Sequence, residues 1–163
     1  MNEASYEQIL KVLVDADVEF ILIGGLAAMA MGSSRATFDI DVVYERSAGN
    51  FRKLATCLAA YQPYLRGAPA GLPFRLDVET IRRGLNFTLT TSIGALDLFG
   101  EVAGGGSYGE LLTNSETIEI FHVPCRCVTL QKLIELKRAA GRPKDLEAIA
   151  ELELLLDNQG VDE

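Results

Sequence analysis

The chain has 163 residues and a mass of 17.7 kDa, the size of one compact domain. Hydrophobic residues make up 48% and charged residues 23%, proportions that fit a globular protein and exclude disordered or low-complexity sequence. The net charge of −8 and the isoelectric point of about 4.7 argue against broad electrostatic binding of DNA or anionic lipid.

Neither a membrane span nor an export signal is expected. The apolar stretch over 20–31 is interrupted by Gly24 and Gly25 and is shorter than the roughly 20 residues that cross a bilayer. The first residues are acidic where a signal peptide would be basic. An odd number of cysteines favours reduced thiols over a disulfide framework: Cys57, Cys125 and Cys127. We therefore expect a cytoplasmic protein.

The first part of the chain is predicted to alternate helices with short strands. Apolar spacing predicts a helix over 5–14, then a strand over 19–23 that leads through a glycine pair into a helix over 26–31. From 38 to 42, apolar residues alternate with two aspartates, which predicts a strand with both carboxylates on the face away from the core. A further helix is predicted over 48–61.

The middle of the chain is predicted to be mostly antiparallel sheet. Prolines and glycines predict a loop over 63–73, and five glycines predict another over 100–109. Strands are predicted at 74–80, 85–91, 95–99, 117–120 and 125–128.

Two helices are expected at the C-terminal end. Thr129 can cap a helix that Gly141 ends, and Pro143 suits the first turn of a last helix that runs to about residue 157. The irregular mixture of helices and strands predicts an α+β fold with a small mixed sheet flanked by helices. We expect residues 1–163 to form a single domain, with the helices of 129–157 packed on it.

A cluster of carboxylates is the first candidate for chemistry. Asp39 and Asp41 project from one strand face about 6.6 Å apart and repel each other unless a cation lies between them. A third carboxylate on a neighbouring strand, about 4.8 Å away, would complete an oxygen cage for divalent metal ions. Asp97 is the best candidate because the leucines beside it would face the core. Asp77 and Glu79 show a similar alternation and remain alternatives.

The residues around this pair are suited to phosphate. Gly24 and Gly25 end a strand and open a helix, where backbone N–H groups and the helix dipole can face an anion. A triphosphate with its metal is the simplest joint ligand. The loop before the aspartates adds side chains that could contact phosphate: Ser33, Ser34, Arg35 and Thr37.

These motifs resemble those of a known superfamily. The chain resembles the nucleotidyltransferases related to DNA polymerase β. The resemblance lies in an apolar residue followed by Gly24-Gly25, then a gap of about a dozen residues, then Asp39-Ile-Asp41 and a later aspartate on a strand. The segments 35–41 and 136–145 are closer still to the AbiEii-type toxin nucleotidyltransferases and to small bacterial proteins similar to them. The resemblance spans roughly residues 20–157.

The resemblance implies a fold, a reaction and a set of site residues. The whole chain would be one nucleotidyltransferase-like domain that moves a nucleotidyl group from an NTP to an acceptor hydroxyl on RNA, protein or a small molecule. Two Mg²⁺ (or Mn²⁺) ions would lie on Asp39, Asp41 and Asp97. Lys137 would contact the triphosphate, and Asp145 would belong to the same site. A companion protein of a toxin–antitoxin pair is a possible partner.

The distal motif also has a meaning independent of the family. Lys137 continues the apolar stripe of its predicted helix, and Asp145 lines up with the apolar residues of the last helix. The two side chains could therefore pair with each other, or the lysine could reach a ligand. The segment 132–144 holds five basic residues and one acidic residue, whereas 145–163 holds seven acidic residues and no basic one.

Two hypotheses of function follow. The first is a metal-dependent nucleotidyltransferase. The alternative is a non-catalytic nucleotide-binding or partner-binding member of a toxin–antitoxin pair that shares the fold. Transfer of a labelled nucleotide in the presence of Mg²⁺ distinguishes the two.

Overall fold

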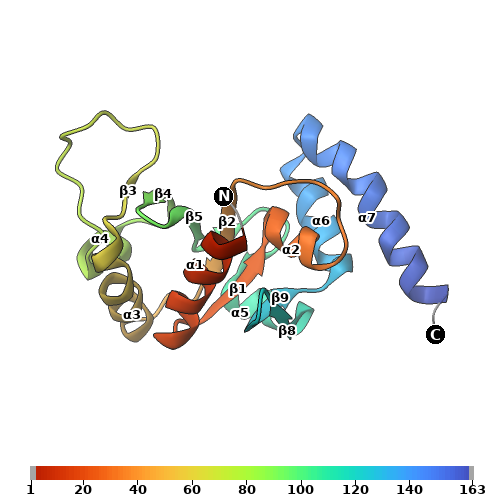
Figure 1. Ribbon diagram of the computed structural model, residues 1–163, viewed down its shortest axis with the longest axis horizontal. Helices are drawn as coiled ribbons and strands as arrows, with labels where there is room; N and C mark the ends of the chain where they lie inside the picture. The colour runs from red at the N-terminus through yellow and green to blue at the C-terminus, as the bar shows by residue number, and fades with distance from the viewer. Residues whose placement is uncertain (1–2, 162–163) are drawn as a thin grey trace.

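The centre of the computed structural model, which describes residues 3–161, is a seven-stranded mixed sheet (Figure 1). Its strand order is β3-β4-β5-β2-β1-β9-β8. The pairs β1–β9 and β2–β5 are parallel, and the other neighbouring pairs are antiparallel. The strands are β1 (Phe20–Ile23), β2 (Asp39–Tyr44), β3 (Tyr64–Leu65), β4 (Asn86–Thr91), β5 (Gly94–Phe99), β8 (Ser115–Ile120) and β9 (Val123–Val128). The predicted α+β class with a mixed sheet is confirmed.

Helices flank this sheet. They are α1 (Glu3–Asp15), α2 (Gly24–Ala30), α3 (Ala48–Leu58), α4 (Val78–Arg83), α5 (Tyr108–Leu111), α6 (Leu130–Ala140) and α7 (Pro143–Val161), with 3₁₀ turns at Ala59–Tyr61 and Leu112–Asn114. Helix α1 packs on β9 and β5, and α2 packs on β1 and β2. Helix α6 packs on α2, and α7 packs on α6. In Figure 1, α3 and α4 lie at one end of the molecule and α6 and α7 at the other. Within residues 3–161, none of the helices is both long and apolar enough for a membrane span.

The ends of α6 follow the predicted capping pattern. The Thr129 side chain accepts a hydrogen bond from the backbone N–H of Lys132 at 3.3 Å. At the other end, Gly141 adopts a left-handed φ of 66° and donates its N–H to the Lys137 carbonyl. These two caps fix where α6 ends and therefore where α7 begins.

Alternation along β2 and β5 separates the core from the carboxylates. Ile40 and Val42 on β2 and Leu96 and Leu98 on β5 are fully buried. The aspartates between them face the opposite side of the sheet, because successive side chains of a strand point to opposite faces. Burial of these four side chains holds the two strands in register and so fixes the position of the aspartates.

The predicted strand over 74–80 is wrong. Residues 72–77 have no regular structure, and α4 begins at Val78. The Asp77 carboxylate accepts a hydrogen bond from the Thr80 N–H at 2.8 Å, so that it caps the helix. The local capping interaction therefore outweighs the apparent alternation of apolar and polar residues.

The two predicted loops also contain regular structure. The segment 63–73 includes the edge strand β3, which pairs with β4. The segment 100–109 includes a small hairpin of β6 (Glu101–Val102) and β7 (Gly106–Ser107) and the start of α5. Both strands of this hairpin and β3 are two residues long, too short for a periodic pattern to show.

Candidate functional site

Three carboxylates meet where β2 and β5 run side by side. The parallel register places Asp41 opposite Asp97, and Asp39 lies two residues before Asp41 on the same face. One oxygen from each of the three carboxylates lies within 4.8 Å of the other two. Within the described residues this is the one group of three or more acidic, histidine or cysteine side chains so arranged. Asp77, which caps α4, and Glu79, in its first turn, lie outside this group.

Burial and mutual repulsion make ionisation of this cluster unfavourable. Burial, followed by repulsion from Asp39 and Asp97, raises the pKa of Asp41 to about 8. Burial also raises the pKa of Asp97, although a hydrogen bond from Arg66 opposes the shift. Asp41 Oδ1 is buried and has no hydrogen-bond partner among the described residues. An oxygen-only donor set with an unpartnered buried carboxylate oxygen fits a hard divalent cation such as Mg²⁺ or Mn²⁺.

The glycine pair allows α2 to lie against these residues. A Cβ on Gly24, whose φ is +71°, would lie 2.2 Å from Asp41 Oδ2, and a Cβ on Gly25 would lie 2.7 Å from Thr37 Oγ1. The sequence pattern predicts that these glycines make room for a phosphate. In the structure, the side chains of Asp41 and Thr37 lie against the glycines on the side where a Cβ would project. The glycines therefore permit the close approach of β2, and of Thr37 in the loop before it, to the start of α2.

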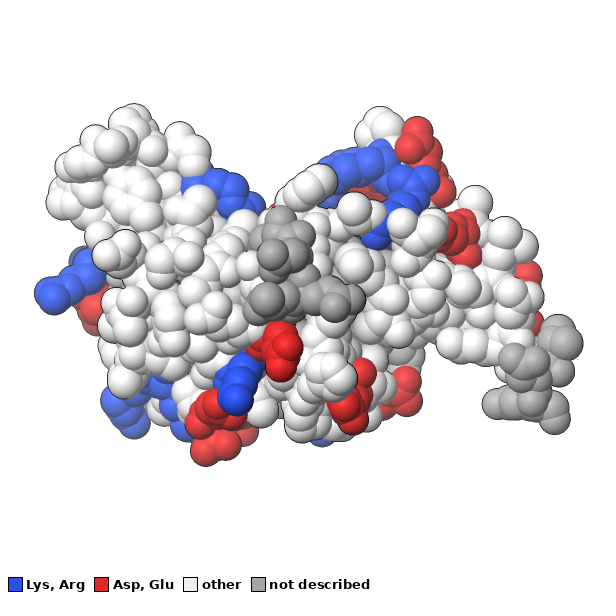
Figure 2. Space-filling view, viewed as in Figure 1, with Lys and Arg blue, Asp and Glu red and all other residues white. Residues whose placement is uncertain are grey.

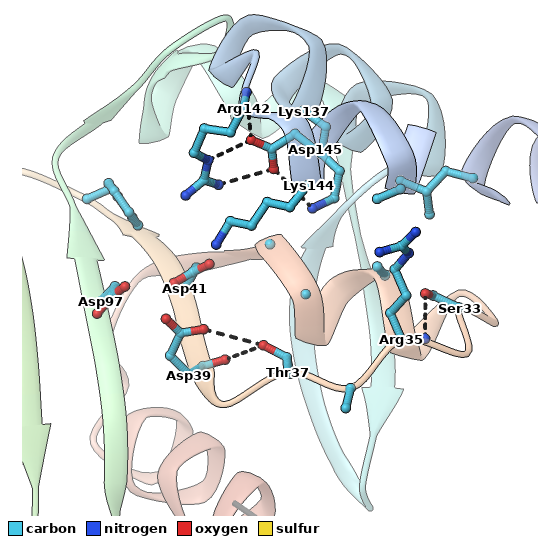
Figure 3. Close-up of a pocket in the computed structure, with 17 residues that line it drawn as sticks. Ser33, Arg35, Thr37, Asp39, Asp41, Asp97, Lys137, Arg142, Lys144 and Asp145 are labelled. Atoms are coloured by element: carbon cyan, nitrogen blue, oxygen red, sulfur yellow. Dashed lines mark hydrogen bonds and ion pairs between the residues drawn. The ribbon is translucent and has the colours of Figure 1, made fainter. Parts of the chain in front are cut away.

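A cleft of about 280 Å³ separates the carboxylates from the junction of α6 and α7. Figure 2 shows a hollow between the part of the molecule that carries the β3–α4 segment and the part formed by α6 and α7, with basic residues on both sides. In Figure 3 the carboxylates of Asp39, Asp41 and Asp97 lie on one side of the cleft, and Lys137, Arg142 and Lys144 come from the opposite side, where Asp145 lies between them. Four basic residues line it: Arg35, Lys137, Arg142 and Lys144.

Lys137 and Asp145 are close together in this cleft. Lys137 Nζ lies 3.8 Å from Asp145 Oδ1, and the Asp145 side chain is 2% exposed. Arg142 donates two side-chain hydrogen bonds to the same carboxylate, at 2.6 and 3.1 Å. Burial opposes ionisation of Asp145, but these bonds and Lys137 outweigh it and lower its pKa. Burial lowers the pKa of Lys137, and Asp145 partly offsets this shift. The geometry therefore contains the predicted pair and also places Lys137 at the cleft.

The loop between α2 and β2 is attached to α7. The hydroxyls of Ser33 and Ser34 donate to Glu151 at 2.5 and 2.7 Å. Arg35 lies 3.9 Å from Glu147. The Thr37 hydroxyl donates to the backbone carbonyl of Asp39 at 3.1 Å and lies 3.3 Å from its carboxylate. Ser33, Arg35 and Thr37 line the cleft, whereas Ser34 is not among its lining residues. The phosphate-binding roles of these residues stay predictions.

Three basic residues near the carboxylates were not predicted from the sequence. Arg142 and Lys144 lie in the distal motif, but the pattern assigns them no role of their own. Arg66, which contacts Asp97, follows an edge strand inside a segment predicted to be a loop. The basic character of the segment 132–144 indicates that Arg142 and Lys144 could bind an anion. No sequence pattern indicates a role for Arg66.

Comparisons with known proteins connect this site to a fold. No family model matches the chain, and no curated protein matches it. Among solved structures, the chain is similar to the crystal structure of a "putative nucleotidyltransferase" from Thermotoga maritima, with a TM-score of 0.58 and 12% sequence identity. The superposition covers 93% of this chain and 94% of that one. At this identity the likeness shows that the fold is nucleotidyltransferase-like.

Proposed function

We propose that this protein is a metal-dependent nucleotidyltransferase that moves an NMP group from an NTP to an acceptor hydroxyl. The observation that carries the proposal is the carboxylate cluster, with its unpartnered Asp41 oxygen, facing basic side chains across one cleft. Negative and positive groups placed in this way suit a ligand that has both metal ions and phosphates. The nucleotidyltransferase-like fold supports the same reaction.

The two sides of the cleft would have different tasks. Asp39, Asp41 and Asp97 would hold Mg²⁺ or Mn²⁺, which when bound polarises the α-phosphate and neutralises charge on the departing pyrophosphate. Lys137 and Lys144 would bind the β- and γ-phosphates and stabilise the leaving group as it gains charge. Transfer forms the bond between the acceptor oxygen and the α-phosphorus, breaks the bond from the α-phosphorus to the oxygen of the departing pyrophosphate, and releases the hydroxyl proton to water.

Lys144 is the basic residue best placed for a ligand. In the described part of the chain it has no ion-pair partner, whereas the Arg142 guanidinium is bound to Asp145. Figure 3 shows the Lys144 side chain directed across the cleft towards the aspartates. Arg142 and Asp145 would then act together by holding the start of α7, and with it Lys144, in position.

A transfer assay tests the proposal. Each of the four NTPs, labelled at the α-phosphate, is incubated with Mg²⁺ or Mn²⁺, the protein, and RNA, protein or small-molecule fractions from cells. Label should appear in one fraction with the wild type and not with the Asp39→Asn, Asp41→Asn double variant. If no NTP gives transfer to any fraction while nucleotide still binds, the non-catalytic alternative, including a role beside a toxin–antitoxin companion, is correct.

A thermal measurement tests the metal site independently of transfer. Millimolar Mg²⁺ or Mn²⁺ should raise the melting temperature of the wild type, because an ion that binds only the folded state stabilises it. The Asp39→Asn, Asp41→Asn variant should lose this response and, without metal, should melt no lower than the wild type, since it removes like charges that repel. The exposed pair Asp15→Asn, Asp17→Asn has the same spacing and is the matched control. A wild type that does not respond to metal would contradict the site.

A further inference from the structure

Arg66 places a permanent positive charge beside the carboxylate cluster. Its Nη2 donates to Asp97 Oδ1 at 2.7 Å and to the Leu89 carbonyl at 2.6 Å. Its Nη1 lies 3.6 Å from Asp39 Oδ2. The backbone N–H of Arg66 donates to the Thr88 carbonyl at 2.9 Å, which continues the pairing of β3 with β4. Backbone and side chain are therefore both attached to β4 beside the cluster.

The contact is partly shielded from solvent. The side chains of Arg66 and Asp97 are 29% and 13% exposed. Arg66 Nε is buried without a partner among the described residues, so its terminal nitrogens make the contacts that hold the guanidinium. Charge-assisted hydrogen bonds of this kind are stronger than those between neutral groups, and a guanidinium stays protonated at any physiological pH. Asp97 therefore has a bound cation before any metal arrives.

We infer that Arg66 takes the place of one of the two divalent cations expected at this cluster, so that the nucleotide-free protein binds a single divalent ion. In the ion-bound state all three carboxylates are ionised and carry three negative charges, and the guanidinium offsets one of them. Two negative charges remain, and one divalent ion neutralises them. Asp41, whose Oδ1 has no partner, and Asp39, which Arg66 approaches only to 3.6 Å, are left as the ligands for that ion.

The inference rests on the proposed function only in taking the cluster to bind divalent metal. It adds that a residue outside the three aspartates sets how many ions bind. Replacing the guanidinium by a neutral side chain should therefore create a second ion site. A single positive charge at contact distance weakens binding of a divalent ion by roughly tenfold or more, even in the dielectric of water.

The test is a titration of the full-length, nucleotide-free protein with Mn²⁺. Calorimetry gives the number of ions and their affinities, and electron paramagnetic resonance of free Mn²⁺ provides an independent count. The wild type should bind one ion. Arg66→Gln should bind two, the second at least about tenfold more tightly than any second ion in the wild type. Arg66→Lys keeps the charge and should bind one.

Arg75→Gln is the matched control. Arg75 is exposed on the same β3–α4 segment and makes no ion pair within the described residues. This variant loses one positive charge away from the cluster and should bind one ion, as the wild type does. Circular dichroism of each variant shows whether it has folded. If Arg66→Gln does not fold, Arg66→Lys still tests the inference. This variant keeps the positive charge, so a count other than one bound ion would contradict the role of Arg66.

The outcomes separate the two proposals. Two ions on the wild type, or one ion with unchanged affinity on both the wild type and Arg66→Gln, overturns the role of Arg66 and leaves the proposed function standing. Absence of Mn²⁺ binding by both proteins overturns the metal site itself and with it the proposed function.

Discussion

Replacing Asp41 by asparagine should stabilise the metal-free protein, and the gain should increase with pH. Burial and the neighbouring carboxylates raise the pKa of Asp41 to about 8, from 3.8 for an exposed aspartate. Because the folded state binds this proton more tightly than the unfolded state, the free energy of unfolding decreases as pH rises between these two values. Asparagine does not titrate and keeps the shape of the protonated acid.

The pKa difference sets the size of the effect. Each pKa unit corresponds to about 1.4 kcal/mol, so the rise in the pKa from 3.8 to about 8 costs the wild type at most about 6 kcal/mol once Asp41 is ionised. Asp41→Asn and the wild type should therefore have similar stabilities near pH 4. The variant should be more stable by about 3 kcal/mol at pH 6 and by about 6 kcal/mol at pH 9.

Urea unfolding in EDTA at pH 5, 7 and 9, followed by circular dichroism, measures this difference. The variant Asp157→Asn, which removes a carboxylate from an exposed site on α7, controls for the change in net charge. A difference between Asp41→Asn and the wild type that stays constant from pH 5 to 9 would refute the reasoning. So would a variant that is less stable than the wild type at pH 9.

Three further predictions concern the cleft. Mg²⁺ affinity should increase from pH 6 to about 8 and level off above it, since the ion must displace the Asp41 proton; a flat profile in calorimetry would contradict this. Lys137→Ala should weaken NTP binding about ten- to a hundredfold, because a charge-assisted contact to phosphate contributes roughly 1.5–3 kcal/mol. Arg138→Ala, which changes an exposed neighbour, should leave NTP binding unchanged. Equal NTP affinities for the wild type and Lys137→Ala would make Lys137 a structural partner of Asp145 instead. Gly24→Ala should lower the free energy of unfolding by about 1–3 kcal/mol, because residue 24 has a positive φ and an added Cβ would clash with Asp41. Gly49→Ala should not be destabilising, since there is open space where its Cβ would lie. Thermal melts of the two variants measure the difference.

The arrangement of the carboxylates could be predicted because it depends on short-range periodicity. Strict alternation around Asp39, Asp41 and Asp97 fixes their face of the sheet, and burial of the intervening apolar residues enforces it. That β2 and β5 are direct neighbours, which brings Asp41 opposite Asp97, depends on the topology of the whole sheet. The resemblance to a known superfamily suggests this pairing, whereas neither strand alone specifies its neighbour.

The residues that were missed depend on contacts between distant segments. Arg66 reaches Asp97 from a two-residue edge strand that has no periodic pattern and lies among prolines and glycines. The incorrect strand over 74–80 could have been avoided, however. Asp77 is a good N-cap residue, Glu79 suits the first turn, and Gly84 ends the helix, so the capping signals of α4 were present in the sequence.

The parallel pairing of β1 with β9 has a consequence for biosynthesis. A ribosome makes β1, β2 and β5 before it reaches β9, and it makes α6 and α7 later still. A nascent chain that stops before Val123 has the three aspartates but exposes one hydrogen-bonding edge of the buried strand β1, which is open to pairing with other chains. It also lacks Lys137, Arg142 and Lys144, and α6, which covers α2. The cleft therefore forms only when the last fifth of the chain has emerged, and a partly synthesised chain is an aggregation hazard before its cleft is complete.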